Sequence, residues 1–126
     1  MKYRLGVFGT LVATLAVAAS VAFAAEFRGM GLRVQFLDMV GAVSVRVRNG
    51  STMPITVTAI HVFVEHQSAP LEVPVTWAAA CVGQTVGVGK ELRCRGAADV
   101  DPLGATTAVI DLLKADGTTL QIELVA

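Results

Sequence analysis

The stretch Val43-Ser44-Val45-Arg46-Val47-Arg48 decides the fold of this chain. Valine alternates with a polar residue at every second position, which is the period of a β-strand with one dry and one solvated face. Asn49-Gly50-Ser51-Thr52-Met53-Pro54 follows directly, and its composition predicts a loop. We therefore expect a half-buried strand that ends in a turn.

The segment after this loop, residues 55–65, is dominated by β-branched residues and predicts a second strand. Its alternation changes phase, because Ile55 and Val57 share one face whereas Val62 lies on the other. A β-bulge near Ala59-Ile60 would restore a single buried face; alternatively, the strand is covered on both sides.

A hairpin at the C-terminal end is the clearest local prediction. Thr106–Leu113 predicts one strand, and Leu120–Leu124, in which apolar residues alternate with Gln121 and Glu123, predicts another. Between them, Lys114-Ala115-Asp116-Gly117 predicts a tight turn whose Asp-Gly pair supplies positive φ angles.

The rest of the chain predicts shorter strands and loops. Leu32–Phe36 predicts a first strand, and the prolines within residues 67–75 limit any strand there to a short or an edge strand. Gly83–Gly89 predicts a loop or a weak hairpin that ends near Leu92–Arg95, and Gly96–Gly104 predicts a linker.

Together these segments indicate an all-β domain. About seven short strands in about 100 residues, with no amphipathic helix after residue 26, predict an immunoglobulin-like antiparallel sandwich. The sandwich would occupy residues 26–126 as one domain, since a segment of this length buries a single core. One apolar helix within residues 1–25 would precede it.

The N-terminal segment predicts export across a membrane. Lys2 and Arg4 precede the uncharged residues 5–25, which include Ala22-Phe23-Ala24, a small-x-small pattern that signal peptidases cleave. This segment is a signal peptide cleaved after Ala24, a pilin-type leader cut earlier, or an uncleaved helix that anchors the chain in the cytoplasmic membrane. Each interpretation places the sandwich outside the cytoplasm, whether extracellular, at the cell surface or in the periplasm.

Cys81 and Cys94 are the two cysteines of the chain. In an exported domain such a pair predicts a disulfide, which would close a loop of about 14 residues and contribute about 3 kcal/mol. Separate thiols and a metal site are the alternatives, although zinc would need two further soft ligands.

The charge balance bears on the partners. The chain has 10 basic and 10 acidic side chains, and without Lys2 and Arg4 it carries 8 against 10, a formal −2. Nucleic acids and anionic lipids require a concentrated basic face, so we expect neither as a partner. The arginines of the Val43–Arg48 strand, together with Arg93 and Arg95 on either side of Cys94, are interpreted as solvated strand positions.

The order of these features is familiar. A Val-x-Val-x-Val strand, an Asn-Gly loop, the segment Pro54–Val62, a Gly-rich middle and a final Asp-Gly hairpin resemble the small sandwich domains of archaeal secreted and surface proteins, including pilin-like filament subunits. The resemblance covers Val43–Val125. It implies a non-catalytic surface domain, often self-assembling and often glycosylated.

Candidate chemistry is sparse. Asn49-Gly50-Ser51 is an N-glycosylation acceptor motif, or else a plain turn. His61 and His66 point to opposite faces of a strand and do not form one metal site. No serine lies in a Gly-x-Ser-x-Gly elbow. Catalytic, cofactor and metal residues are therefore not expected, although serines and carboxylates in ordinary contexts are present: Ser44, Ser51, Ser68, Glu65, Glu72, Asp99 and Asp101.

The function that follows is structural. We expect a non-enzymatic surface or envelope protein, either a filament or pilus-like subunit, that acts through protein–protein contacts and self-association. Within Ala25–Met39, a strand in which apolar and polar residues alternate is expected to pair with the sheet edge of a neighbouring copy. The alternative is an accessory or ligand-binding domain of an envelope complex, held in the membrane by residues 5–25.

Overall fold

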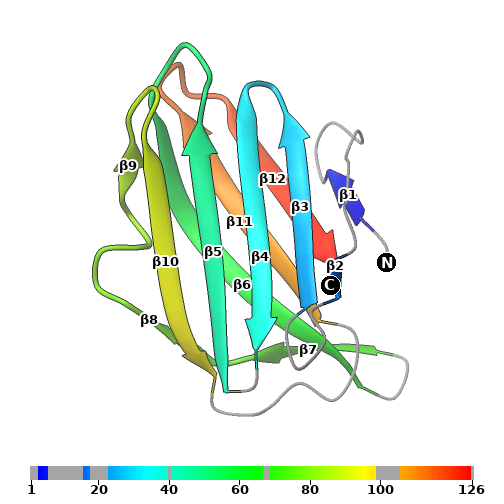
Figure 1. The fold of residues 1–126 in the computed structure, drawn as a ribbon. Helices are drawn as coiled ribbons and strands as arrows, with labels where there is room; N and C mark the ends of the chain where they lie inside the picture. The colour runs from blue at the N-terminus through cyan, green and yellow to red at the C-terminus, as the bar shows by residue number, and fades with distance from the viewer. Residues whose placement is uncertain are drawn as a thin grey trace.

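The computed structural model describes residues 3–5, 16–17, 23–39, 41–66, 69–98 and 106–125, and the side chains of residues 25–38, 41–65, 69–98 and 106–125. These residues form two antiparallel sheets that lie face to face, and none of the described residues is helical (Figure 1). The all-β prediction is confirmed.

Each sheet contains six strands. Sheet A runs in the order β1 (Tyr3–Leu5), β12 (Thr119–Val125), β11 (Thr106–Lys114), β6 (Ile55–His66) and β7 (Ala69–Val73), and β9 (Thr85–Val86) pairs with the start of β6. Sheet B runs in the order β2 (Ala16–Val17), β3 (Phe23–Gly29), β4 (Leu32–Met39), β5 (Ala42–Asn49), β10 (Glu91–Ala98) and β8 (Val75–Trp77). The strands outnumber the expected count of about seven, because strands as short as β8 and β9 show no period in the sequence.

Alternation along the strands builds one core between the sheets. On β5, Val43, Val45 and Val47 are buried as their spacing predicts, whereas Arg46 and Arg48 face solvent. Burial of each large apolar side chain contributes about 1.5–3 kcal/mol. The largest fully buried side chains come from both sheets: Phe27, Phe36, Ile55, Ile110, Leu112, Leu120, Ile122 and Leu124.

The predicted β-bulge lies in β6. Asp111 of β11 pairs with Ala59, but the next residue, Leu112, pairs with Val57, so Thr58 is the extra residue. The apolar residues on both sides of the bulge are buried: Ile55, Val57, Ile60 and Val62. The bulge therefore restores one buried face, and the alternative of a strand covered on both sides is excluded.

Glycine sets the geometry of two hairpin turns. In the C-terminal hairpin, Gly117 has a φ of 88° and donates its N–H to the Lys114 carbonyl at 3.0 Å. Asp116 does not have a positive φ; its carboxylate accepts the Thr118 N–H at 2.9 Å. The expectation of positive φ is thus correct for Gly117 and wrong for Asp116. A second hairpin, which the sequence analysis missed, joins β3 to β4 through Met30-Gly31 with φ angles of 54° and 76°.

The prediction that a linker begins at Gly96 is wrong. β10 continues through Gly96 to Ala98 instead of ending near Arg95. A Cβ atom on Gly96 would lie 2.4 Å from Val75 Cγ1 and 2.9 Å from Trp77 Cε3. The glycine therefore lets β8 pack against β10, and it belongs to the strand because of this close approach.

The N-terminal segment falls mostly outside the described residues. Within it, β1 pairs with β12 and β2 pairs with β3. The apolar helix and the cleavage site after Ala24 stay predictions. Cleavage there would shorten β3 but retain Ala25 and Phe27, which are buried in the core.

Candidate functional site

Asn49 ties the two sheets together at one end of the sandwich. It lies at the end of β5 and is fully buried. Its Nδ2 donates to the carbonyl oxygens of Met53 and Val86, both at 2.9 Å, and so reaches the segment before β6 and the strand β9. Its Oδ1 accepts the Ser51 N–H at 3.0 Å and the Ser51 hydroxyl at 2.5 Å.

The glycosylation prediction falls on this buried amide. A glycan would be attached to Nδ2 of Asn49, whose two hydrogens are both donated inside the protein. The folded chain offers no accessible acceptor nitrogen at this motif. Glycosylation stays a prediction, and it would require modification before folding.

A second tie lies at the opposite end of the sandwich. Thr106, at the start of β11, donates its hydroxyl to Oδ2 of Asp38 on β4 at 2.5 Å, and both side chains are buried. With Asn49, these are the buried polar side chains of the described part. No local pattern indicates this pair, because the two residues are 68 positions apart.

Cys81 and Cys94 form the predicted disulfide, with Cα atoms 5.2 Å apart and both side chains buried. The bond joins β10 to the loop after β8, and the half-buried Trp77 of β8 packs against the core to which both cysteines belong. It uses both thiols, which excludes the thiol and metal alternatives. Disulfides persist in oxidising compartments, so the bond indicates an extracellular or periplasmic environment.

The outer face of sheet B gathers positive charge. It carries all six arginines of the described side chains, together with two glutamates: Arg28, Arg33, Arg46, Arg48, Arg93, Arg95, Glu26 and Glu91. We name this surface the arginine face. Six positive groups against two negative ones give it a formal charge of +4.

The strand register places arginines beside one another. Arg33 lies directly opposite both Arg28 and Arg48 on the neighbouring strands, and Arg46 lies opposite Arg93. Like charges in directly opposite positions destabilise a sheet. The arginines are solvent-exposed strand positions, as predicted, but they gather on one face, so the premise that the chain lacks a concentrated basic face is wrong.

Glu26 offsets part of this repulsion. Its carboxylate accepts the Nε–H of Arg28 at 2.9 Å and the Nε–H of Arg33. Burial acts to raise the pKa of Glu26, but the hydrogen bonds from the two arginines outweigh it, so the pKa lies below its ordinary value.

Glu91 offsets the repulsion between the next pair of arginines, Arg46 and Arg93. Its carboxylate lies 3.1 Å from Nε of Arg93 and 3.7 Å from Nε of Arg46. Within the described side chains, no acidic group forms an ion pair with Arg48 or Arg95. These two arginines have no acidic partner among the described side chains and carry half of the formal +4 of the arginine face.

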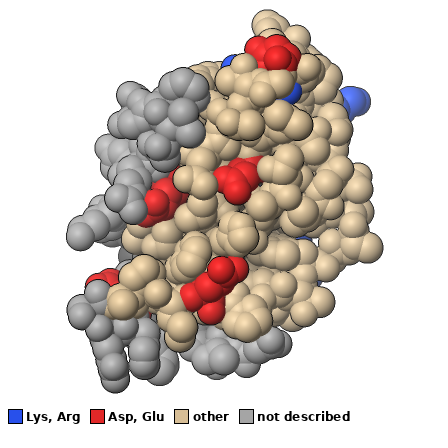
Figure 2. All heavy atoms as spheres, turned by 180° about the vertical axis from the view of Figure 1, so that it is seen from behind, with Lys and Arg blue, Asp and Glu red and all other residues tan. Residues whose placement is uncertain are grey.

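The outer face of sheet A is acidic. Its outward strand positions carry four carboxylates and, among the side chains described there, no Lys or Arg: Glu65, Glu72, Asp111 and Glu123. We name this surface the acidic face; Figure 2 shows acidic groups over its middle and basic groups only at its rim. The described side chains give it a formal charge of −4, and His61 Nδ1 lies 3.0 Å from the Glu72 carboxylate.

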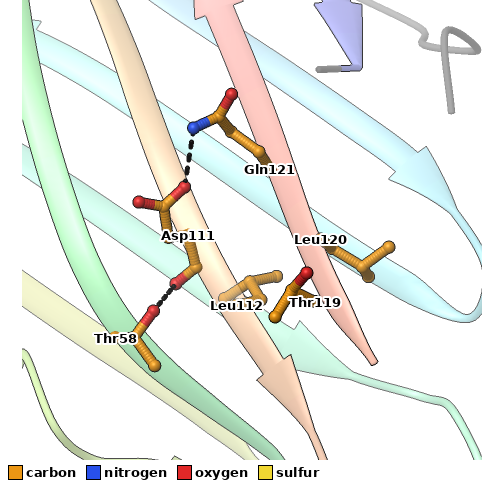
Figure 3. Close-up of a pocket in the computed structure, with 6 residues that line it drawn as sticks. All are labelled: Thr58, Asp111, Leu112, Thr119, Leu120 and Gln121. Atoms are coloured by element: carbon orange, nitrogen blue, oxygen red, sulfur yellow. Dashed lines mark hydrogen bonds between the residues drawn. The ribbon is translucent and has the colours of Figure 1, made fainter. Parts of the chain in front are cut away.

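The bulge in β6 leaves a shallow hollow on the acidic face (Figure 3). Its volume is about 370 Å³, and six residues line it: Thr58, Asp111, Leu112, Thr119, Leu120 and Gln121. The Asp111 carbonyl accepts the Thr58 hydroxyl at 3.1 Å, and its carboxylate accepts the Gln121 amide at 2.9 Å. Asp111 is the single titratable group among these residues, so the hollow offers no acid–base pair.

The remaining candidates from the sequence do not come together. His61 pairs with Glu72, and the side chain of His66 lies outside the described residues, as do Ser68, Asp99 and Asp101. Across the described ranges, no three His, Cys, Asp or Glu side chains are grouped as a metal ion would need. Nor does that part of the chain contain a helix long and apolar enough to cross a membrane.

Comparison with known proteins adds no relative: the chain matches no family model and no curated sequence. The resemblance to archaeal surface sandwiches therefore stays a prediction. We argue the function of the chain from its own fold and surface.

Proposed function

We propose that this chain is an exported, non-catalytic structural protein of the cell surface or envelope, which acts through contacts with proteins, including its own copies. One observation carries the proposal: the two broad faces of the sandwich bear opposite formal charges, +4 and −4. Proteins use complementary potentials of this kind to select and orient partners. The disulfide supports a location in an oxidising compartment.

The strand order supports an immunoglobulin-like relationship. Sheet B contains the order β4-β5-β10-β8 and sheet A the order β12-β11-β6-β7. Taken in chain sequence, these correspond to the A-B-E-D and G-F-C-C′ orders of immunoglobulin domains, with β3 added outside the first strand. Many cell-surface domains share this architecture, although the fold by itself names no partner.

The edges of the two sheets give weaker support for contacts between copies than the charged faces do. Leu32–Leu37 lies within β4, which is paired on both sides, so it cannot join a neighbour's sheet as the sequence suggested. The edge partners β1 and β2 belong to the predicted leader. Cleavage after Ala24 would leave β12 and β3 as open edges, and open edges pair readily with other chains.

Fractionation of the native protein, followed by its intact mass before and after reduction, tests this proposal. We expect the chain in the envelope or the medium, two hydrogens lighter before reduction. A mature N-terminus at Ala25 would identify a signal peptide, whereas retention of residues 1–24 would identify an anchor. Recovery from the cytosol with Cys81 and Cys94 reduced would overturn the proposal.

A further inference from the structure

We propose that copies of this chain stack head to tail, with the arginine face of one copy on the acidic face of the next. This inference rests on the proposed structural function and names its partner as a second copy. The two faces lie on opposite sides of one sandwich, as Figures 1 and 2 show from front and back. A contact between copies therefore joins two different surfaces.

The charges of the two faces match in size and differ in sign. The arginine face has a formal +4 and the acidic face a formal −4. Arg48 and Arg95 lack an ion-pair partner within the described part of their own chain. Carboxylates from a second copy would offset the repulsion that the register imposes on the arginines.

The acidic face also presents apolar surface between its carboxylates. Phe63 and Val109 are half-buried there, on the neighbouring strands β6 and β11. Arginine stems pack against such surface while their guanidinium groups reach an acid, and a guanidinium over the ring of Phe63 gains a cation–π contact. The two faces therefore complement each other in apolar contact as well as in charge.

The geometry predicts an open assembly. A contact between two different patches does not close into a dimer, so each added copy presents a free face to the next. Four strands about 4.8 Å apart and about 27 Å long give a face of roughly 500 Å². The contact then buries about 1,000 Å² in total, the lower limit for a specific interface. Each contact should be weak, and the stack should be reversible.

A polyanion on the arginine face is the competing explanation, and the charge balance disfavours it. Domains that bind nucleic acid typically have a pI above about 9, whereas this chain is formally neutral with a pI of about 6.7. The acidic face would repel a long polyanion that extends past the arginine face. A contact between two copies instead brings the arginine face of one onto the acidic face of the other, so both kinds of face are neutralised.

Sedimentation and electron microscopy of the protein as the cell delivers it test the stack. We expect linear oligomers at about 10 mM salt, where charges interact over about 30 Å, and monomers near 1 M, where the range is about 3 Å. A chain that stays monomeric at low salt would overturn the inference. So would oligomers that persist in high salt, because these would indicate apolar or edge contacts.

Two double variants identify the faces. Arg48→Glu with Arg95→Glu brings the arginine face to a formal charge of zero without removing an ion pair of the described part. Glu65→Lys with Glu72→Lys brings the acidic face to a formal charge of zero and removes the contact between His61 and Glu72. Each variant alone should remain monomeric at low salt. Mixed in equal amounts they should form a one-to-one pair and no longer chain, because each retains the face that the other needs.

A control and the contrary outcomes complete the test. Lys90→Glu, in a loop outside both faces, should assemble like the wild type, and circular dichroism should show that every variant is folded. Oligomers of either double variant alone, or no pairing in the mixture, would refute the stack. Binding of heparin to wild-type protein that remains monomeric at low salt would assign the arginine face to a polyanion instead. If the protein is exported, disulfide-bonded and monomeric, the stack is refuted but the proposed function is not. If the chain is cytosolic and reduced, the proposed function is refuted.

Discussion

Replacement of Asn49 by alanine should be one of the most destabilising single changes in this chain. It removes four hydrogen bonds, of which two connect sheet B to the carbonyls of Met53 and Val86. Once Oδ1 of Asn49 is gone, the Ser51 hydroxyl can donate its one hydrogen to the Met53 carbonyl 3.0 Å away, so Val86 is the carbonyl left without its side-chain donor. At about 0.5–1.5 kcal/mol for each lost bond and 1–3 kcal/mol for a buried group left unpaired, the expected loss is at least about 3 kcal/mol.

The variant Asn49→Asp keeps the shape of the side chain and changes its hydrogen bonds, so it shows how much of the stability depends on the hydrogen bonds alone. The aspartate retains an acceptor for Ser51, but it places an oxygen where Nδ2 donated to two carbonyls. It should destabilise the chain about as much as alanine at neutral pH. Burial against two carbonyl oxygens raises the pKa of this new carboxyl. Its protonation in acid restores one hydrogen-bond donor, so the difference in free energy of unfolding between the variant and the wild type becomes smaller.

Urea unfolding followed by tryptophan fluorescence measures these changes. A loss of about 3 kcal/mol also lowers the thermal midpoint by roughly 10–20 °C for a domain of this size. Thr52→Ala is the matched control, because this exposed residue lies in the same loop and should change stability by less than about 0.5 kcal/mol. If Asn49→Ala unfolds at the same urea concentration as Thr52→Ala, Asn49 does not tie the sheets. A native mass that exceeds the chain mass by a glycan, and that loses this excess in Ser51→Ala, would show that Asn49 is modified instead.

Three further predictions concern the disulfide, the β8–β10 contact and the arginine face. Loss of the disulfide in Cys81→Ser with Cys94→Ser should cost about 3 kcal/mol; equal urea midpoints for the oxidised and reduced wild type would contradict this. Gly96→Ala should cost about 1–3 kcal/mol, because its Cβ would lie 2.4 Å from a β8 side chain. Its tryptophan emission should shift to the red, whereas Gly87→Ala, where the nearest atom is 3.4 Å away, should leave the emission unchanged. Because the pKa of Glu26 is lowered in the folded state, its contribution is present above the ordinary glutamate range near pH 4.3 and is lost as the pH falls through the lowered value. Glu26→Gln should therefore cost about 1 kcal/mol at pH 7 and almost nothing at pH 2, and an equal cost at both would contradict the ion-pair explanation.

Features that depend on neighbours in the chain could be predicted from the sequence. The alternation of Val43, Val45 and Val47 identified a strand and its buried face, and the change of phase before Ile60 identified a bulge within two residues. The two cysteines predicted a bond because an exported leader indicated an oxidising compartment. Each of these inferences used a period, a spacing or a compartment, and none needed the arrangement of distant strands.

Features that depend on distant strands could not be predicted. Gly96 resembled the start of a linker, and only the approach of Trp77 shows that the strand needs a glycine there. The motif at Asn49 could mark a glycan or a turn, and the choice depends on Val86, which lies 37 residues away. The arginine face emerges only when the register brings four strands together, because no single strand holds more than two arginines.

The charged faces and the leader are connected through β12. The register places Arg4 of β1 opposite Glu123, at the border of the acidic face. Cleavage after Ala24 would remove this cation and uncover the outer edge of β12. If the chain both matures by cleavage and stacks through its faces, removal of residues 1–24 takes the basic residues Lys2 and Arg4 from the chain in the step that releases the protein outside the cytoplasm. Assembly would then follow export, since the precursor carries two more basic residues than the mature chain and is therefore less attractive to the arginine face of a second copy.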